Sequence, residues 1–243
     1  MSDFLLIGKD LPDSLELAQG FTSTDSKVYA ISKSEAEAAS FQADNIFTSA
    51  LNHASAISSR SLIIKAETKL SGLNRYIIVF DAYNYATKFE LDRPEDLSPA
   101  IDSMISSYQY FINELLFRLE QKKEPAFITF LVKTYPSKYE LLINGNKNIN
   151  IHPVSNIVNT AQNAFIALAE NISTLVGERN YLSVLLTKCD PSNELFNNET
   201  AIAAWISQSL ETLETQKNKQ TVKQAATWVK TGGKLPGGFP FFK

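Results

Sequence analysis

Apolar residues along this chain gather in short runs that alternate with longer segments of helical periodicity. The runs predict strands covered on both faces, because they lack the polar alternation of a half-exposed strand. They occupy residues 4–8, 27–31, 46–48, 76–80, 126–132 and 181–187. Helical patterns lie between and after them, at residues 12–21, 35–40, 54–70, 100–121, 155–176, 200–213 and 221–231.

This alternation predicts a Rossmann-type α/β fold, a doubly wound, mostly parallel sheet with helices on both faces. We expect a hairpin to interrupt this alternation of strands and helices at one place. Asn144 and Gly145 form a turn signal between apolar residues 139–143 and 149–151, which predicts a hairpin near the cleft. No repeat or change of composition divides the chain, so residues 1–243 are expected to form one domain.

The charge and the cysteine content of the chain indicate which classes of partner and which cellular compartment to expect. The formal net charge is −3 and the densest basic stretch, residues 216–223, is short, so no nucleic-acid partner is expected. No run is long enough to span a membrane, and the first residues do not resemble a signal peptide. Cys189 is the only cysteine, so no intramolecular disulfide can form, and we expect a cytoplasmic protein.

Residues that bind metals or act as nucleophiles are few and scattered. His53 and His152 have no histidine or cysteine partner at metal-binding spacing, so no metal site is predicted. Cys189 has no histidine close by in the sequence and is expected to be an ordinary buried thiol. Tyr83 and Tyr85, after the fourth strand, would line the cleft, where they could stack on a ligand or pack against the next helix.

Four segments carry a resemblance to a known family: residues 76–82, 163–171, 181–187 with Pro191, and 229–238. Taken in this order, they resemble the short-chain dehydrogenase/reductase family. The first resembles its fourth strand, and the second resembles the helix that follows its catalytic lysine. The third resembles its sixth strand, and the fourth resembles its C-terminal Thr-Gly and Gly-Gly segment. The resemblance covers nearly the whole chain and implies a Rossmann fold for which NADP or NAD is the possible cofactor.

The glycine-rich turn that the resemblance implies is incomplete. Family members hold the pyrophosphate with three glycines after the first strand; here Gly8 fills the first place, and Pro12 and Ser14 replace the other two. Proline removes an amide donor, and serine adds bulk where the backbone must approach closely. A pyrophosphate could still lie near Lys9, Ser14 and the start of the helix.

Three further positions are implied by the resemblance as cofactor or catalytic residues. Lys33, after the second strand, stands near the family's ribose-binding aspartate and could favour NADP, or it is an exposed lysine at a strand end. Ala82 lies in the segment where the family reads Asn-Asn-Ala-Gly beside the cofactor. Thr134, after the fifth strand, takes the place of the catalytic serine and could donate a hydrogen bond.

The family's proton-transfer pair is missing. The mechanism needs a tyrosine followed four residues later by a lysine, whose charge lowers the pKa of the phenol. Aligning residues 163–165 with those after that lysine puts Gln162 at the lysine and Val158 at the tyrosine, and the wider spacing of the enoyl-reductase branch puts Ser155 there. None of these side chains can take the role of the pair.

Three functions are compatible with this sequence. We favour a divergent member that keeps the fold but not the dehydrogenase reaction and acts as a binding or interaction subunit, because the glycine turn and the catalytic pair are lost independently. An NAD(P)-dependent oxidoreductase with a rewired site is the alternative, and an enzyme of another chemistry in the same cleft is the third. In a rewired site the proton donor and its lysine would come from Tyr83, Tyr85, Tyr135, Tyr139, Lys133 and Lys138.

The two long helices, 100–121 and 155–176, are expected to build a homo-dimer or homo-tetramer. The resemblance implies this, because the family pairs these helices in a four-helix interface. The first helix is also apolar beyond the stripe that covers a sheet, at Met104, Phe111 and Phe117. The alternative is that neighbouring helices of the same chain bury these residues.

Overall fold

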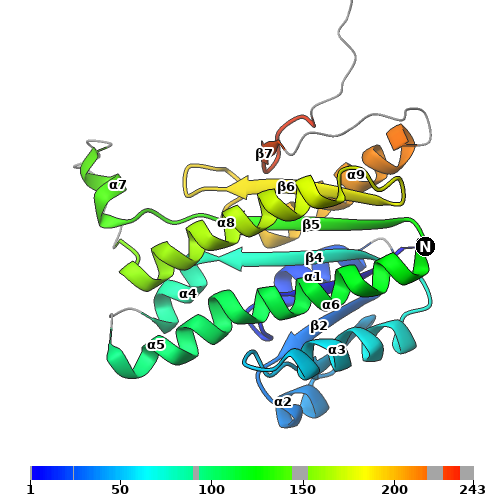
Figure 1. Ribbon diagram of the computed structural model, residues 1–243, viewed down its shortest axis with the longest axis horizontal. Coiled ribbons are helices and arrows are strands. Elements are labelled where there is room, and N and C mark those ends of the chain that lie inside the picture. The colour runs from blue at the N-terminus through cyan, green and yellow to red at the C-terminus, as the bar shows by residue number, and fades with distance from the viewer. Residues whose placement is uncertain (1, 24, 90–92, 144–152, 218–226, 236–243) are drawn as a thin grey trace, which may run out of the picture.

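A seven-stranded sheet forms the centre of the molecule (Figure 1), and the computed structural model describes residues 2–23, 25–89, 93–143, 153–217 and 227–235 around it. All of its strand pairs are parallel, in the order β3-β2-β1-β4-β5-β6-β7. This confirms the predicted Rossmann-type sheet. The strands are Asp3–Ile7 (β1), Val28–Ser32 (β2), Ile46–Ala50 (β3), Leu73–Asp81 (β4), Ala126–Lys133 (β5), Leu182–Cys189 (β6) and Trp228–Lys230 (β7).

Helices cover both faces of the sheet. α3, α6 and α8 pack on the face that is in front in Figure 1, whereas α1 and α9 pack on the face behind it. The helices are α1 (Leu15–Thr22), α2 (Glu35–Ser40), α3 (Ala56–Lys69), α4 (Ala82–Lys88), α5 (Pro94–Ile101), the π-helical segment η1 (Asp102–Ser106), α6 (Ser107–Lys122), α7 (Lys138–Ile143), α8 (Asn156–Val176) and α9 (Glu199–Lys217).

The apolar runs form strands because both of their faces are buried. In β1, Leu5 and Ile7 belong to the core beneath α3, α6 and α8, while Phe4 and Leu6 belong to the core beneath α1 and α9. Burying a large apolar side chain stabilises the fold by roughly 1.5–3 kcal/mol. A sheet with two such cores therefore has a fixed register, and its carboxyl edge is a defined place for side chains.

Gly8 ends β1 at the point where the strand order changes direction, as predicted. Its φ is +92°, in the region that favours glycine. A Cβ at this position would lie 1.9 Å from the carbonyl oxygen of Val79 and 2.7 Å from the hydroxyl oxygen of Tyr108. Only glycine therefore lets β1 pass this close to β4, at the switch point where open α/β sheets bind their ligands.

Two predicted elements are wrong. Residues 139–143 form part of the helix α7 and not a hairpin strand, because Ser137 and Glu140 make a capping box: the Glu140 N–H donates to Ser137 Oγ, and the Ser137 N–H donates to the Glu140 carboxylate. Residues 144–152, which include the expected turn and second strand, lie outside the described part. In the predicted helix 221–231, residues 228–230 instead form β7, which pairs with β6.

The first long helix also differs from the prediction. It runs continuously through α5, η1 and α6, beginning at Pro94 and not near residue 100. Met104 and Phe111 do not point toward another copy, because both are buried in the core of this chain; Phe117 is 57% exposed. No helix in the ranges described above combines the length and the apolar character needed to cross a membrane.

Candidate functional site at the carboxyl edge of the sheet

Four charged side chains meet where β1, β4 and β5 end. Lys9 follows Gly8 after β1, Asp81 is the last residue of β4, and Lys133 is the last residue of β5. Glu199 arrives from the start of α9 on the α1 side of the sheet. All four side chains are at least nine-tenths buried. This is the crevice in which Rossmann folds bind dinucleotides.

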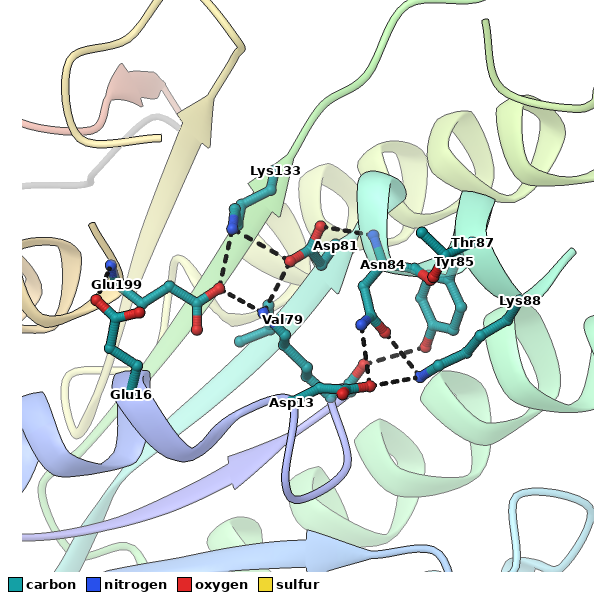
Figure 2. A network of polar contacts seen from close by, with 12 residues as sticks. Asp13, Glu16, Val79, Asp81, Asn84, Tyr85, Thr87, Lys88, Lys133 and Glu199 are labelled. Atoms are coloured by element: carbon teal, nitrogen blue, oxygen red, sulfur yellow. Dashed lines mark hydrogen bonds and ion pairs between the residues drawn. The ribbon is translucent and has the colours of Figure 1, made fainter. Parts of the chain in front are cut away.

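The four groups form a closed ion-pair network, and Figure 2 shows Lys133, Asp81 and Glu199 converging. The Lys133 ammonium lies 3.2 Å from Asp81 Oδ2 and 2.9 Å from Glu199 Oε1. The Lys9 ammonium lies 3.0 Å from Asp81 Oδ2 and is also paired with Glu199 Oε1. Two ammonium groups thus face two carboxylates, and their formal charges balance.

The electrostatics keep this network ionised despite its burial. Burial by itself raises the pKa of Asp81, but Lys133 and Lys9 outweigh it and hold that pKa below its ordinary value. Burial lowers the pKa of Lys133, but Asp81 and Glu199 more than offset this and raise it. A carboxylate and a lysine that are both fixed in their charged forms stabilise each other and are poorly suited to exchange protons near neutral pH.

Helix α1 and an aromatic side chain hold Glu199 in place. The Glu199 N–H donates to Oε1 of Glu16, a residue of α1, at 3.1 Å, so the two helices are joined next to the network. Phe196 lies just before α9, and the Lys133 ammonium is 5.1 Å from the centre of its ring. Glu199 Oε2 is buried and accepts no hydrogen bond within the described ranges. The hydrogen bond to α1 and the ion pairs with the two lysines therefore both fix the position of Glu199.

The turn between β1 and α1 is tied to its neighbours by its own polar groups. The Leu11 N–H donates to the carbonyl oxygen of Ile31, and the Ser14 N–H donates to that of Asp10. Ser14 is fully buried, and its hydroxyl has no hydrogen-bond partner among the residues described. The backbone N–H groups of Leu11 and Ser14 therefore already donate to carbonyl oxygens of this chain, and Pro12 has no N–H to donate.

Asp13 adds a negative charge to the same turn. In Figure 2 its carboxylate meets Asn84 and Lys88 of α4: the Asn84 side-chain amide donates at 3.0 Å, and the Lys88 ammonium lies 3.2 Å away. Partial burial raises the pKa of Asp13. The hydrogen bonds from Asn84 and Lys88 and the charge of Lys88 lower it by a larger amount, so the net shift is downward. This carboxylate therefore ties the turn to α4.

The sequence-predicted residues lie around this network in different roles. Gly8 and Lys9 are in the crevice, and Ala82 is fully buried directly after Asp81. Lys33 is exposed after β2. Thr134 is half-buried, and its N–H donates to the carbonyl oxygen of Cys189, which ties the end of β5 to β6.

The residues aligned with the missing proton-transfer pair have packing roles. Gln162 Oε1 accepts a hydrogen bond from the Tyr135 N–H at 2.9 Å, so this side chain holds the segment after β5. Val158 is fully buried. The Ser155 hydroxyl donates to the carbonyl oxygen of Phe89.

The tyrosines considered for a rewired site lie in different surroundings. Tyr85 is buried, donates to the carbonyl oxygen of Gly8 and is 3.0 Å from the Tyr108 hydroxyl; burial raises its pKa far above the ordinary value. Burial also raises the pKa of Tyr135, whose ring contacts that of Tyr83 with centres 5.2 Å apart. Tyr139 is 70% exposed on α7.

His53 belongs to a second polar cluster that the sequence did not reveal. Its Nδ1 lies 2.9 Å from the Ser107 hydroxyl oxygen, and its Nε2 lies 3.5 Å from Asp10 Oδ1. A cavity of about 70 Å³ beside it is also lined by Gly8 and Lys88. That space holds a few waters at most, given about 30 Å³ for one water in the liquid.

Metal and thiol chemistry find no support at this edge. Within the described ranges, no group of three or more histidine, cysteine, aspartate or glutamate residues could hold a metal ion. His152 lies outside these ranges. Cys189 is a buried free thiol, and burial raises its pKa to about 11, so little of it is thiolate near neutral pH.

Comparison with solved structures identifies the fold. The chain is similar to a 3-ketoacyl-(acyl-carrier-protein) reductase from Brucella melitensis complexed with NADH, at 12% identity and a TM-score of 0.57 over 95% of this chain and 96% of that one. It is similar to a short-chain dehydrogenase/reductase from Vibrio parahaemolyticus, at 14% identity and a TM-score of 0.58 over 96% and 100%.

It is also similar to ElxO with NADP bound, at 13% identity and a TM-score of 0.59 over 95% of this chain and 96% of that one. Neither a protein-family model nor a curated protein sequence matches this chain. The similarity therefore establishes the short-chain dehydrogenase/reductase fold, as the sequence resemblance implied.

Proposed function

We propose that this chain is a divergent protein with the short-chain dehydrogenase/reductase fold that acts as a binding or interaction subunit without the family's hydride transfer. The observation that supports this most is the buried network of Lys9, Asp81, Lys133 and Glu199 in the crevice. Each lysine there already has two carboxylate partners from its own chain.

A dinucleotide pyrophosphate would have to break this network. It would bring negative charge to a place that already contains Asp81 and Glu199, and it would have to take Lys9 or Lys133 from them. Removing one partner from a buried ion pair leaves an uncompensated charge, which costs about 3–5 kcal/mol. The network therefore opposes a cofactor at this edge.

The turn after β1 supports the same proposal. The pyrophosphate of a dinucleotide is held by free backbone N–H groups at a helix N-terminus. Here Pro12 has none, the Ser14 N–H is used by Asp10, and Asp13 adds a carboxylate. We infer that these residues do not fit a dinucleotide, and we derive no reaction step through one.

Turnover tests the proposal directly. We expect no consumption of NADPH or NADH by the purified chain with a panel of ketones, aldehydes and enoyl thioesters, because no tyrosine–lysine pair is in place. A short-chain reductase with an intact pair, assayed in parallel, controls for the substrates. Steady turnover that is lost in Tyr135→Phe but kept in Tyr139→Phe would establish the rewired reductase instead.

The rewired NAD(P)-dependent oxidoreductase is the second candidate. The observation in its favour is that two similar structures contain NADH or NADP on the same fold. In this chain Tyr83, 51% exposed, and Tyr135 lie in ring contact beside the crevice. They are the residues that such an enzyme would have to use.

We also propose a homo-oligomer built on the long helices. Its support is the exposed apolar surface that remains after Met104 and Phe111 are buried: Phe117 on α6 is 57% exposed, and Leu175 on α8 is 58% exposed. A two-fold axis would make such a patch complementary to itself.

A further inference from the structure

A groove of about 550 Å³ lies along the edge strand β3, between α2 and α3. Its volume falls within the roughly 300–1,000 Å³ that is usual for small-molecule sites. The groove is separate from the carboxyl-edge crevice, since none of the residues of the charged network lines it. Its apolar walls are formed by Tyr29, Ala38, Phe41, Ile46, Phe47 and Ile64.

The apolar wall is partly open to solvent. Ile64 on α3 is 41% exposed, and Phe41 and Phe47 are half-buried. α2 has only six residues and buries none of them, so it covers this end of the sheet incompletely. The wall therefore offers open apolar side chains to a ligand.

Two lysines of α3 give the groove a positive rim. The Lys69 ammonium lies 4.6 Å from the centre of the Phe47 ring, so its charge is held over the apolar wall. Lys65 lies 3.4 Å from Glu35 of α2, with the two side chains 47% and 70% exposed. An exposed pair of this kind contributes little to stability, so it opens easily to another anion.

The charge at the rim favours one class of ligand. The groove combines an apolar wall with two ammonium groups, of which Lys65 already pairs with Glu35. A cationic ligand would be repelled by the two ammonium groups, and a neutral ligand would gain no ion pair with Lys69.

We propose that this groove binds an amphipathic organic acid, a hydrocarbon chain that carries one carboxylate. The chain lies on Phe41, Phe47 and Ile64, and the carboxylate pairs with Lys69 and Lys65. This inference goes beyond the proposed function and does not depend on it, because it concerns different residues at another part of the sheet.

Calorimetry with decanoate as the probe, on the full chain and below the micelle concentration, tests the proposal. We expect saturable binding of one decanoate, and binding of decanol that is weaker by about tenfold, the factor that corresponds to 1.4 kcal/mol. Decylammonium should not bind in the groove, because it carries the charge of the rim.

Matched variants locate the site. Ile64→Glu and Lys69→Glu should each weaken decanoate binding by about tenfold or more. The controls introduce glutamate at comparable residues elsewhere: Leu142→Glu on α7, where Leu142 is 73% exposed, and Lys27→Glu at an exposed position before β2. Both controls should bind decanoate within about twofold of the unchanged protein. Thermal unfolding of each variant shows that it is folded.

The proposal is overturned if decanoate does not bind below about 1 mM, an affinity of only about −4 kcal/mol. It is equally overturned if decanol binds as tightly as decanoate, or if the control variants lose binding as the groove variants do. If Ile64→Glu fails to fold, Lys69→Glu and the comparison of decanoate with decanol still decide the question.

Discussion

Asp81 must stay ionised in a site closed to water, and its two lysine neighbours make this possible. Burial works against its charge, while Lys133 and Lys9 favour it and lower its pKa. Each lysine in turn depends on Asp81 and Glu199. At this scale the four residues act as one unit, and removing one changes the environment of the other three.

Changing Lys133 to methionine tests this coupling. We expect Lys133→Met to lower the free energy of unfolding by about 3–5 kcal/mol, because two buried carboxylates then share one ammonium. Lys33→Met, at an exposed lysine, should change it by less than about 0.5 kcal/mol. Urea denaturation measures both.

Adding Glu199→Gln to Lys133→Met restores the charge balance, so the double variant should be more stable than Lys133→Met alone. If the two changes are simply additive, the network does not act as a unit.

The pKa shifts predict how stability depends on pH. A carboxyl whose pKa is lowered by folding contributes stability above its unfolded pKa, about 3.9 for aspartate, and loses it as the pH falls through the folded value. Lys133 has a raised pKa, so its contribution is complete below about pH 10.4 and is lost as the pH rises through the folded value. The network should therefore be stable across the neutral range and weaken in acid below about pH 4.

Denaturation at a series of pH values from acid to neutral checks this. Asp81→Asn should show a shallower loss of stability in acid than the unchanged protein, because it lacks the carboxyl that must be protonated. Asp44→Asn, at an exposed position, should follow the unchanged protein. Parallel curves for all three would mean that Asp81 has an ordinary pKa in the folded state.

At the scale of elements, most of the apolar surface of α6 and α8 is buried in the core of this chain. Met104 and Phe111, which the sequence assigned to a partner, are buried inside the chain because α8 packs against η1 and α6 supplies the same core. What remains exposed on these two helices includes Phe117 and Leu175. An interface between copies must use this smaller surface.

Light scattering at micromolar concentration tests the oligomer. We expect a mass of two or four times the 27.0 kDa of one chain, because exposed apolar helix surface favours association. Phe117→Glu combined with Leu175→Glu should return the mass to 27.0 kDa, while Leu142→Glu on α7 should not. A mass of one chain for the unchanged protein would reject the oligomer.

Most elements were predictable from sequence because both faces of each central strand are buried. All six apolar runs are strands, and Gly8 lies where the pattern placed it. β7 was missed because it is only three residues long, with no apolar run of its own. α7 departs from the prediction because the Asn144-Gly145 pair favours a hairpin, whereas the Ser137–Glu140 capping box begins a helix.

The charged network was harder to predict than the strands. Lys9 and Glu199 are 190 positions apart in the sequence, and no spacing rule links them. The local signals were Asp81 and Lys133, charged residues that end the largely apolar strands β4 and β5. The sequence shows that two glycines of the turn and the tyrosine–lysine pair are absent. The charged network at the carboxyl edge of the sheet is visible only in the structure.

At the scale of the whole molecule, the chain has the short-chain dehydrogenase/reductase fold, and a charge-balanced network lies at the carboxyl edge of its sheet. Seven parallel strands bring Lys9, Asp81 and Lys133 to one edge, and α9 brings Glu199 to meet them. The formal charges at this edge are balanced within the chain. We propose that this arrangement leaves no place for a dinucleotide.

Calorimetric titration of the purified chain with NADH and with NADPH tests this proposal. We expect no binding tighter than about 1 mM for either, an affinity of about −4 kcal/mol. A reductase with an intact glycine turn, titrated in parallel, shows that the measurement detects binding. A micromolar dissociation constant for this chain would contradict the proposal, and all the more so if Lys133→Met weakened that binding while Lys27→Met, at an exposed position, did not.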